Sequence, residues 1–226
     1  MSKIETPSRG KPRIGALALE VTPRCDRNCV YCYNDYRSDD VPSPGELPAD
    51  ELIALAERVM EETGSRALQL TGGEPLLRPD LFAIIEGLKR PGRSLSLVTD
   101  GGLITEAVAA RLASLGVRPV QPTLLAADRD LHDERKGARG FDDTVEGIAR
   151  LKAAGVPVSV SFVCMRRNYE HFERVLELCF ALGVEVVAFS RFCTAGKGAR
   201  AAQELAPDRQ MINACLEAAD RAIERF

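Results

Sequence analysis

The sequence lacks tryptophan, and aromatic residues make up only 5% of its 226 positions. It also lacks a basic excess, because 30 Lys and Arg residues stand against 33 Asp and Glu residues, a formal net charge of −3. Binding to a polyanion normally requires a basic surface, and base stacking requires aromatic side chains. We therefore expect no nucleic acid among the partners of this protein.

Long apolar runs are missing as well. No stretch of about 18 consecutive apolar residues occurs, so we expect no membrane-spanning helix and no membrane partner. Residues 1–13 are polar and basic, without the apolar segment of a secretory signal. The sequence therefore predicts a cytoplasmic protein, with a flexible lead-in at 1–13 and one domain at 14–226 that ends in a C-terminal helix.

Cysteine is the residue type with the most informative spacing. The chain has 7 cysteines, an odd number, and no export signal, which argues against a disulfide framework. Cys25, Cys29 and Cys32 follow the pattern Cys-x3-Cys-x2-Cys. Three thiolates on one loop suit a four-iron cluster that leaves one iron open to a ligand, whereas a structural zinc ion requires a fourth ligand. The alternatives are a zinc site completed by Asp26 or a distant histidine, or three buried cysteines.

The other cysteines, Cys164, Cys179, Cys193 and Cys215, lie far from this loop in the sequence. Free cysteine commonly packs in protein cores as a small hydrophobic residue. We expect packing, rather than ligation of a second cluster, to account for these four positions.

Short apolar runs alternate with amphipathic patterns along the chain. The expected strands are residues 17–21, 67–71, 94–99, 117–125, 156–164 and 184–189. The expected helices are residues 48–63, 80–89, 105–115, 142–154, 168–182 and 207–226, and the arginine-rich stretch 129–139 is expected to be a solvated loop. This alternation predicts an α/β fold with a parallel sheet and outer helices, either doubly wound or an incomplete barrel. In both architectures the active site lies at the carboxyl ends of the strands.

A second motif follows the second expected strand. It reads Thr71-Gly72-Gly73-Glu74-Pro75. Two glycines allow the backbone to approach a ligand closely, and the Glu74 carboxylate is suited to receive an ammonium group. Taken alone, the motif is more typical of an ordinary turn that leads into a helix.

Taken together, the two motifs resemble those of the radical S-adenosylmethionine (SAM) superfamily. The three clustered cysteines match its cluster motif, Tyr31 matches the aromatic residue before the third cysteine, and residues 71–75 match its methionine-binding motif. The resemblance covers roughly residues 14–200 and implies an open (β/α)6 partial TIM barrel. The segment 191–199 resembles the SPASM/Twitch branch of the superfamily.

The resemblance also implies cofactors and site residues. Cys25, Cys29 and Cys32 would hold a 4Fe–4S cluster whose open iron binds SAM, and an electron donor such as flavodoxin or ferredoxin would reduce it. The implied contacts to SAM are Tyr31 and the backbone around Cys193 at the adenine, Thr71, Gly72, Gly73 and Glu74 at the methionine, Thr99 and Thr123 at the methionine or ribose, and Ser161 at the ribose or carboxylate.

The SPASM-like segment favours modification of a peptide or protein side chain by a 5′-deoxyadenosyl radical. Modification of a small molecule or a tetrapyrrole is the alternative within the superfamily. A non-catalytic zinc-binding interaction module is the alternative from a different class. SPASM relatives carry a further region after the barrel, so we expect efficient substrate chemistry only with a C-terminal segment or a partner protein.

Overall fold

The computed structural model describes residues 14–34 and 45–225, so the expected lead-in at 1–13 lies outside the described residues. Six strands appear: β1 (Ala16–Thr22), β2 (Ala67–Gly72), β3 (Ser94–Thr99), β4 (Val120–Pro122), β5 (Ser159–Cys164) and β6 (Val186–Arg191). The first four strands form one parallel sheet in the order β1-β2-β3-β4, and β5 pairs in parallel with β6. Bridges from Val120 to Val158 and from Thr123 to Ser161 connect the two sheets.

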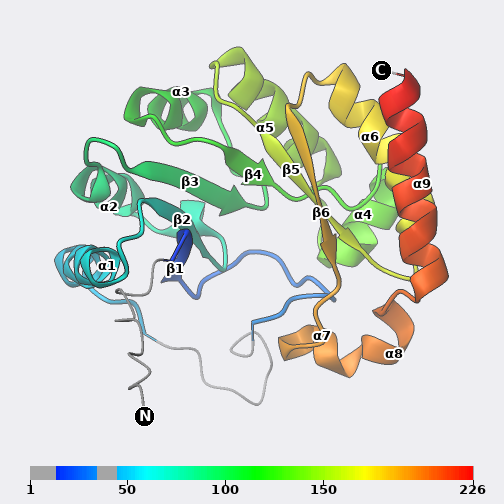
Figure 1. Ribbon diagram of the computed structural model, residues 1–226, viewed down its shortest axis with the longest axis horizontal. Helices are drawn as coiled ribbons and strands as arrows, with labels where there is room; N and C mark the ends of the chain where they lie inside the picture. The colour runs from blue at the N-terminus through cyan, green and yellow to red at the C-terminus, as the bar shows by residue number, and fades with distance from the viewer. Residues whose placement is uncertain (1–13, 35–44, 226) are drawn as a thin grey trace, which may run out of the picture.

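The strands therefore follow one another in chain order along a curved parallel sheet, which runs from β1 to β6 in Figure 1. The two outermost strands each pair with one neighbour only, β1 with β2 and β6 with β5, and in the described part of the chain they do not pair with each other. The sheet thus stays open between them, and the predicted α/β fold with six strand units is confirmed.

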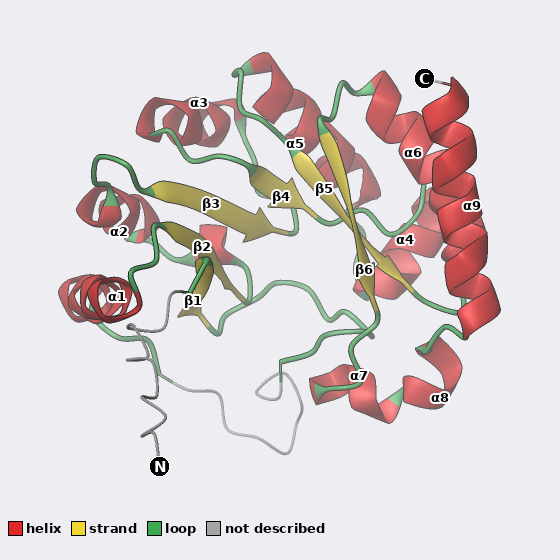
Figure 2. Cartoon of the chain, in the orientation of Figure 1, coloured by secondary structure: helices red, strands yellow, loops and turns green. Residues whose placement is uncertain are grey.

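Helices cover one side of this sheet (Figure 2). The longer ones are α1 (Ala49–Thr63), α2 (Leu81–Leu88), α3 (Glu106–Leu115), α4 (Arg129–Lys136), α5 (Phe141–Ala153), α6 (Phe172–Ala181) and α9 (Arg209–Arg225). The shorter ones are η2 (Pro75–Leu77), η3 (Tyr169–His171), α7 (Gly196–Arg200) and α8 (Ala202–Leu205). None of the helices in the described residues is both long and apolar enough to span a lipid bilayer.

Local sequence signals fix several helix ends. The Thr105 hydroxyl accepts a hydrogen bond from the Val108 amide and caps α3 at its start. Gly64 ends α1 with a φ of 66°, a left-handed conformation that glycine adopts without steric cost. The expected boundaries of these helices are correct to within about one residue, because the capping residues determine them.

The two faces of the sheet differ in composition. Leu68, Leu70, Leu95 and Leu97 are buried against the helices in the main hydrophobic core. Side chains alternate between faces along a strand, so the residues between these leucines, such as Gln69 and Ser96, face the inside of the curved sheet. The inner face is therefore polar and built of small residues, whereas the outer face is apolar.

Three sequence expectations need correction. The fourth strand is only Val120–Pro122, much shorter than 117–125, because prolines at both its ends interrupt the pairing. The expected solvated loop at 129–139 is wrong, since residues 129–136 form α4 and both Arg135 and Lys136 are buried. The expected helix 168–182 begins as the short η3 turn before α6.

Candidate active site

A cavity of about 300 Å³ lies at the carboxyl ends of the first four strands. Most of the residues singled out in the sequence line it, from two loops and the ends of β3 and β4. These residues are Cys25, Cys29, Tyr31, Cys32, Thr71, Gly72, Gly73, Glu74, Thr99 and Thr123. Ser161 and Cys193 are not among the residues that line this cavity. The fold thus brings both sequence motifs to one hollow, as the strand-end rule predicts.

The cysteine loop, residues 25–33, presents its three thiols to the cavity. The Cys25 sulfur accepts a hydrogen bond of 3.4 Å from the Arg27 amide. Burial raises the pKa of the Cys29 thiol, and the positive charge of Lys136 opposes this shift. The Cys29 thiol is thus shielded from solvent and lies near a cation.

A 4Fe–4S cluster takes one thiolate on each of its ligated irons, so its ligands do not converge on a single atom. In the described residues, no three or more Cys, His, Asp or Glu side chains converge as the ligands of a single metal ion. Three thiols on one short loop, all facing one cavity, are the donor set and arrangement that a cluster requires. The residues present therefore fit this group.

Helix α4 supports one side of the cysteine loop. The Asn28 amide donates to the Lys136 carbonyl at 3.2 Å, and the Val30 amide donates to the Arg135 carbonyl at 3.1 Å. At Gly137, which ends α4 with a φ of 65°, a Cβ atom would lie 2.6 Å from the Asn28 carbonyl oxygen. Glycine is therefore required at 137 on two grounds, its left-handed backbone and the close approach of the loop.

Helix α7 supports the other side of the same loop. The Gly198 amide donates to the Cys32 carbonyl at 2.9 Å, and the Lys197 ammonium donates to the Asn28 carbonyl at 3.1 Å. Figure 1 shows the loop running from β1 across to α7, below the carboxyl end of β6. Two helices that are distant in sequence thus hold the loop in place.

The Gly-Gly-Glu turn contacts the chain itself. The Gly73 amide donates to the Thr22 carbonyl and the Glu74 amide to the Arg24 carbonyl, both at 2.8 Å. A Cβ atom at Gly73 would lie 2.1 Å from the Arg24 carbonyl oxygen, which is an impossible contact. A Cβ atom at Gly72 would lie 2.3 Å from the Thr22 carbonyl oxygen. Both glycines are therefore required by the close approach of the segment after β1, a cause that sequence reasoning missed.

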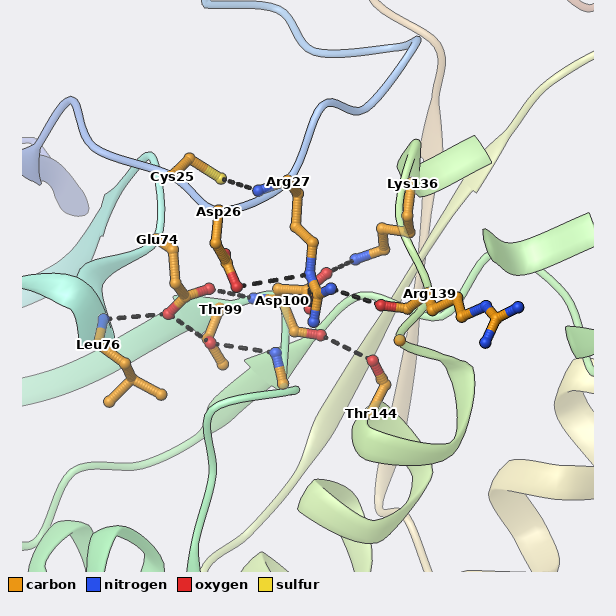
Figure 3. Close-up of polar contacts among 12 residues, drawn as sticks. Cys25, Asp26, Arg27, Glu74, Leu76, Thr99, Asp100, Lys136, Arg139 and Thr144 are labelled. Carbon is orange, nitrogen blue, oxygen red and sulfur yellow. Dashed lines mark hydrogen bonds and ion pairs between the residues drawn. The ribbon is translucent and has the colours of Figure 1, made fainter. Parts of the chain in front are cut away.

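The Glu74 carboxylate is buried and is occupied by internal donors (Figure 3). It accepts hydrogen bonds from the Leu76 amide at 3.0 Å, the Thr99 hydroxyl at 2.8 Å and the Asp100 amide at 2.7 Å. Burial raises the pKa of Glu74 to about 7, although these three donors favour the ionised form. The carboxylate thus anchors the turn that follows β3.

The Thr99 hydroxyl is occupied in the same way. It donates to Glu74 and accepts from the Gly101 amide at 3.1 Å. Both side chains line the cavity, but their hydrogen bonds within the chain hold the β2 and β3 loops together. Any contact that they make to a ligand has to be made in addition to these bonds.

Asp100 is a functional candidate that the sequence analysis did not select. Its carboxylate forms an ion pair with the Arg27 guanidinium at 2.9 Å and a second one with the Lys136 ammonium. Burial alone would raise the pKa of Asp100, but Lys136 and Arg27 outweigh it and hold the pKa below its ordinary value. The group links the cysteine loop, the end of β3 and α4. The signal available in the sequence was an acidic residue placed directly after the expected strand 94–99, next to Thr99.

Tyr31 lies between the cavity and a small apolar cluster formed by Leu125, Met165, Phe192 and Leu205. A hydrogen bond joins its side chain to Cys29, and burial raises the pKa of Tyr31 well above its ordinary value. Tyr31 is therefore placed both to line the cavity and to pack in the core.

The remaining predicted positions differ in exposure. Ser161 is buried on β5 and bridges to Thr123, which lines the cavity. Cys193 is exposed, just after β6. The prediction of core packing is therefore wrong for Cys193, and it is confirmed for the other three cysteines outside the loop. Cys164, Cys179 and Cys215 are buried, and the sulfurs of Cys164 and Cys215 lie 3.8 Å apart.

His132 is a further buried polar residue near the cysteine loop. It is fully buried within α4, where its Nδ1 accepts a hydrogen bond of 3.3 Å from the Leu125 amide. Burial, together with the nearby Lys136, lowers the pKa of His132 to about 3, so the ring is neutral. Its contacts are those of a packed core residue.

A family model described as the radical SAM superfamily matches residues 19–179, well over half of the chain. The chain belongs to the radical SAM superfamily. The cofactors of this family are a 4Fe–4S cluster and SAM, and membership assigns both to this chain.

Several curated radical SAM relatives are similar in sequence. The AdoMet-dependent heme synthase of Oleidesulfovibrio alaskensis is 32% identical over 184 residues, which are 81% of this chain and 47% of the relative. The probable GTP 3′,8-cyclase of Saccharolobus solfataricus is 32% identical over 86% of this chain and 62% of its own length. The PqqA peptide cyclase of Streptomyces rochei is 32% identical over 95% of this chain and 59% of its own length. The chain thus spans about half to three fifths of these relatives.

Solved structures confirm the open partial barrel. Streptococcus suis SuiB bound to S-adenosylmethionine superposes with a TM-score of 0.79 at 14% identity, over 95% of this chain and 49% of SuiB. The structure of anSMEcpe with bound AdoMet gives a TM-score of 0.68 at 22% identity, over 80% of this chain and 50% of that one. These likenesses establish that this chain shares the fold of the corresponding parts of both proteins.

Proposed function

We propose that residues 14–226 form the core domain of an enzyme that reductively cleaves SAM for hydrogen abstraction from a substrate. The observation that carries this proposal is the single cavity lined by Cys25, Cys29, Cys32 and the Gly-Gly-Glu turn. When bound, the reduced cluster supplies the electron that cleaves SAM to methionine and a 5′-deoxyadenosyl radical. The chain has to bind both groups, orient them and limit the access of water.

In this proposal the three loop cysteines hold the cluster, and the Thr71–Glu74 turn shapes the methionine site. The bonds from Glu74 to Thr99 and to the Asp100 amide keep that turn fixed, so its backbone is preorganised for a ligand. Tyr31 and the backbone around Cys193 are proposed for the adenine. Thr123 and Ser161, joined by a bridge between β4 and β5, are proposed for the polar groups of the ribose.

We propose a peptide or protein side chain as the substrate. The support is the likeness to a PqqA peptide cyclase over 95% of this chain, together with the SPASM-like segment after β6. The likeness to a heme synthase and to a GTP cyclase keeps a small-molecule or tetrapyrrole substrate as the second candidate.

The partners follow from the reaction. One-electron reduction of the cluster requires a donor such as flavodoxin or ferredoxin, and closure of the open barrel requires a further segment or a partner protein. We place the protein in the cytoplasm, because the thiols of the cysteine loop have to stay reduced to hold a cluster.

Anaerobic reconstitution tests this function. We expect about four irons and four sulfides per chain, and 5′-deoxyadenosine after addition of SAM and a reductant, detected by mass spectrometry. Bound zinc without SAM cleavage would support the interaction module instead. A reduced, SAM-bound cluster that forms no 5′-deoxyadenosine would overturn the proposal.

A further inference from the structure

The inner face of the sheet carries polar side chains on four neighbouring strands. Gln69 lies on β2, Ser96 on β3, Gln121 on β4 and Ser159 on β5, each directly after a residue that packs in the outer core. Large branched side chains fill the interior of a closed TIM barrel. Here the corresponding surface is left open and bears amides and hydroxyls.

This inner face is hollow along its length. Besides the cavity at the strand ends, a second cavity of about 230 Å³ lies over β1, β2 and β3. The two cavities share Ala18 and Gln69, so they adjoin and form one trough, defined here by the lining of both. Gln69 stands at their junction, below the site proposed for SAM.

Charged groups are confined to one end of the trough. Arg27 and Lys136 are paired with Asp100, and Lys197 contacts Asn28, all around the cysteine loop at the mouth. The second cavity is lined by no charged residue of the described chain. An ionised group that entered this part would lose its hydration without meeting an opposite charge, which is strongly unfavourable.

Polar groups in the trough can nevertheless form hydrogen bonds with a ligand. The Gln121 amide donates to the Ser159 hydroxyl at 3.3 Å, but the side chain of Gln69 has no hydrogen-bond partner in the described part of the chain. A carboxamide offers two donors and an acceptor. A ligand that displaces water from these groups without pairing them loses free energy, so a ligand with matching neutral groups is favoured.

We infer that the trough beside Gln69 binds an uncharged, hydrogen-bonding part of the substrate, of the chemical class of a carboxamide or a backbone peptide group. This inference rests on the proposed function, since it assigns the substrate class to the same site. It favours a peptide over nucleotides and tetrapyrrole carboxylates, whose charged groups would have to remain at the mouth.

Two probes of nearly equal shape test the inference. N-acetylglutamine N-methylamide is neutral, and N-acetylglutamate N-methylamide carries a carboxylate in place of the amide. Binding of each to the reconstituted, SAM-loaded protein is measured by anaerobic equilibrium dialysis with mass spectrometry. We expect the neutral probe to bind at least about tenfold more tightly, since desolvating an unpaired charge costs well over 1.4 kcal/mol.

Variants of one residue localise the effect. Gln69→Leu keeps the size but removes the hydrogen bonds, and should weaken the neutral probe about fivefold or more. Gln69→Lys should reverse the preference in favour of the anionic probe. Ser94→Ala is the matched control, because Ser94 lies on the same face of β3 as Ser96 but outside both cavities.

Equal or tighter binding of the anionic probe by the unmodified protein would overturn the inference. So would retention of neither probe, or an unchanged affinity in a folded Gln69→Leu protein. If that variant does not fold, Ser96→Val provides the same comparison on β3. Formation of 5′-deoxyadenosine is measured in the same samples without any probe, so a failure of the proposed function is seen separately from a failure of this inference.

Discussion

The cysteine loop and the Gly-Gly-Glu turn use their sequence motifs in opposite ways. Both follow neighbouring parallel strands, β1 and β2, and both line the same cavity. In the cysteine loop the thiols face the cavity, while backbone bonds to α4 and α7 hold the loop. In the turn the Glu74 carboxylate is occupied by donors of the chain, and the glycines admit the carbonyls of Thr22 and Arg24. One motif thus presents side-chain thiols to the cavity, and the other supplies a backbone shape.

Asp100 couples these two regions. Its carboxylate pairs with Arg27 of the cysteine loop, and its amide donates to Glu74 of the turn. A shift of either loop therefore has to break bonds at Asp100, which makes this residue the point where the two regions can be separated experimentally.

The largest expected effect comes from the cysteine loop. Replacing Cys25, Cys29 and Cys32 together by alanine should abolish iron binding, because it removes every thiolate at the cavity. The fold should persist, since the hydrophobic core contains none of the three. Iron analysis after reconstitution and circular dichroism measure the two outcomes.

The matched control replaces two cysteines outside the cavity. A Cys164→Ala, Cys215→Ala protein should keep its full iron content, because these buried sulfurs contact each other in the core. A four-iron cluster retained in the first variant, or lost in a folded control, would contradict the assignment of the loop.

The second prediction separates the two regions at Asp100. Asp100→Asn removes the partner of two nearly buried cations, so the apo protein should lose about 3–5 kcal/mol of unfolding free energy. The control Asp142→Asn breaks an exposed ion pair with Arg129 and should cost about 1 kcal/mol or less. Urea unfolding measures both, and equal losses would show that the Asp100 network does not hold the loops together.

These contacts also show what the sequence can and cannot predict. Strand and helix positions came from hydrophobic periodicity, and the cavity location from the rule that parallel strands end together. The role of α4 was missed because residues 129–136 carry many charges, and charge density is typical of solvated loops. Burial of Arg135 and Lys136 depends on packing against the cysteine loop, a long-range contact that no local pattern encodes.

The glycines illustrate a different limit. The sequence predicted that Gly72 and Gly73 permit a close backbone approach, which the structure confirms, but it assigned the approach to a ligand. The approaching atoms include the carbonyls of Thr22 and Arg24. Which partner comes close is decided by the pairing of β1 with β2, and a single motif contains no information on that pairing.

The third prediction tests the shape of the turn. Gly73→Val places a branched side chain where a Cβ atom alone would lie 2.1 Å from the Arg24 carbonyl, so the segment after β1 has to move. SAM affinity, measured by calorimetry on the cluster-loaded protein, should fall more than about tenfold, or about 1.4 kcal/mol. Gly15→Val is the control, because a Cβ atom at Gly15 meets nothing within 4 Å. Unchanged affinity in a folded Gly73→Val protein would refute the predicted role of the turn.

The last prediction is a pH dependence of stability that arises from Glu74. Its pKa rises from about 4.5 to about 7 on folding, because the carboxyl is buried. Between these two pH values the folded state retains a proton that the unfolded state has lost, so the unfolding free energy falls as the pH rises. Glu74→Gln removes this titration. The stability advantage of the unmodified protein over the variant should therefore shrink from about pH 4.5 to about pH 7 and stay level above that range.

Glu57 provides the matched control for this measurement. Its hydrogen bonds to Arg93 lower the pKa of Glu57. Its contribution to the unfolding free energy is therefore fully present above the ordinary pKa of a glutamate and is lost only as the pH falls below it. The stability difference between the unmodified protein and Glu57→Gln should therefore stay nearly constant over the window in which the Glu74 difference changes. Urea unfolding of the three apo proteins across that window measures both differences. A Glu74 difference that is constant, or that grows with pH, would show that this carboxylate is ionised in the folded protein throughout, with its three donors outweighing burial.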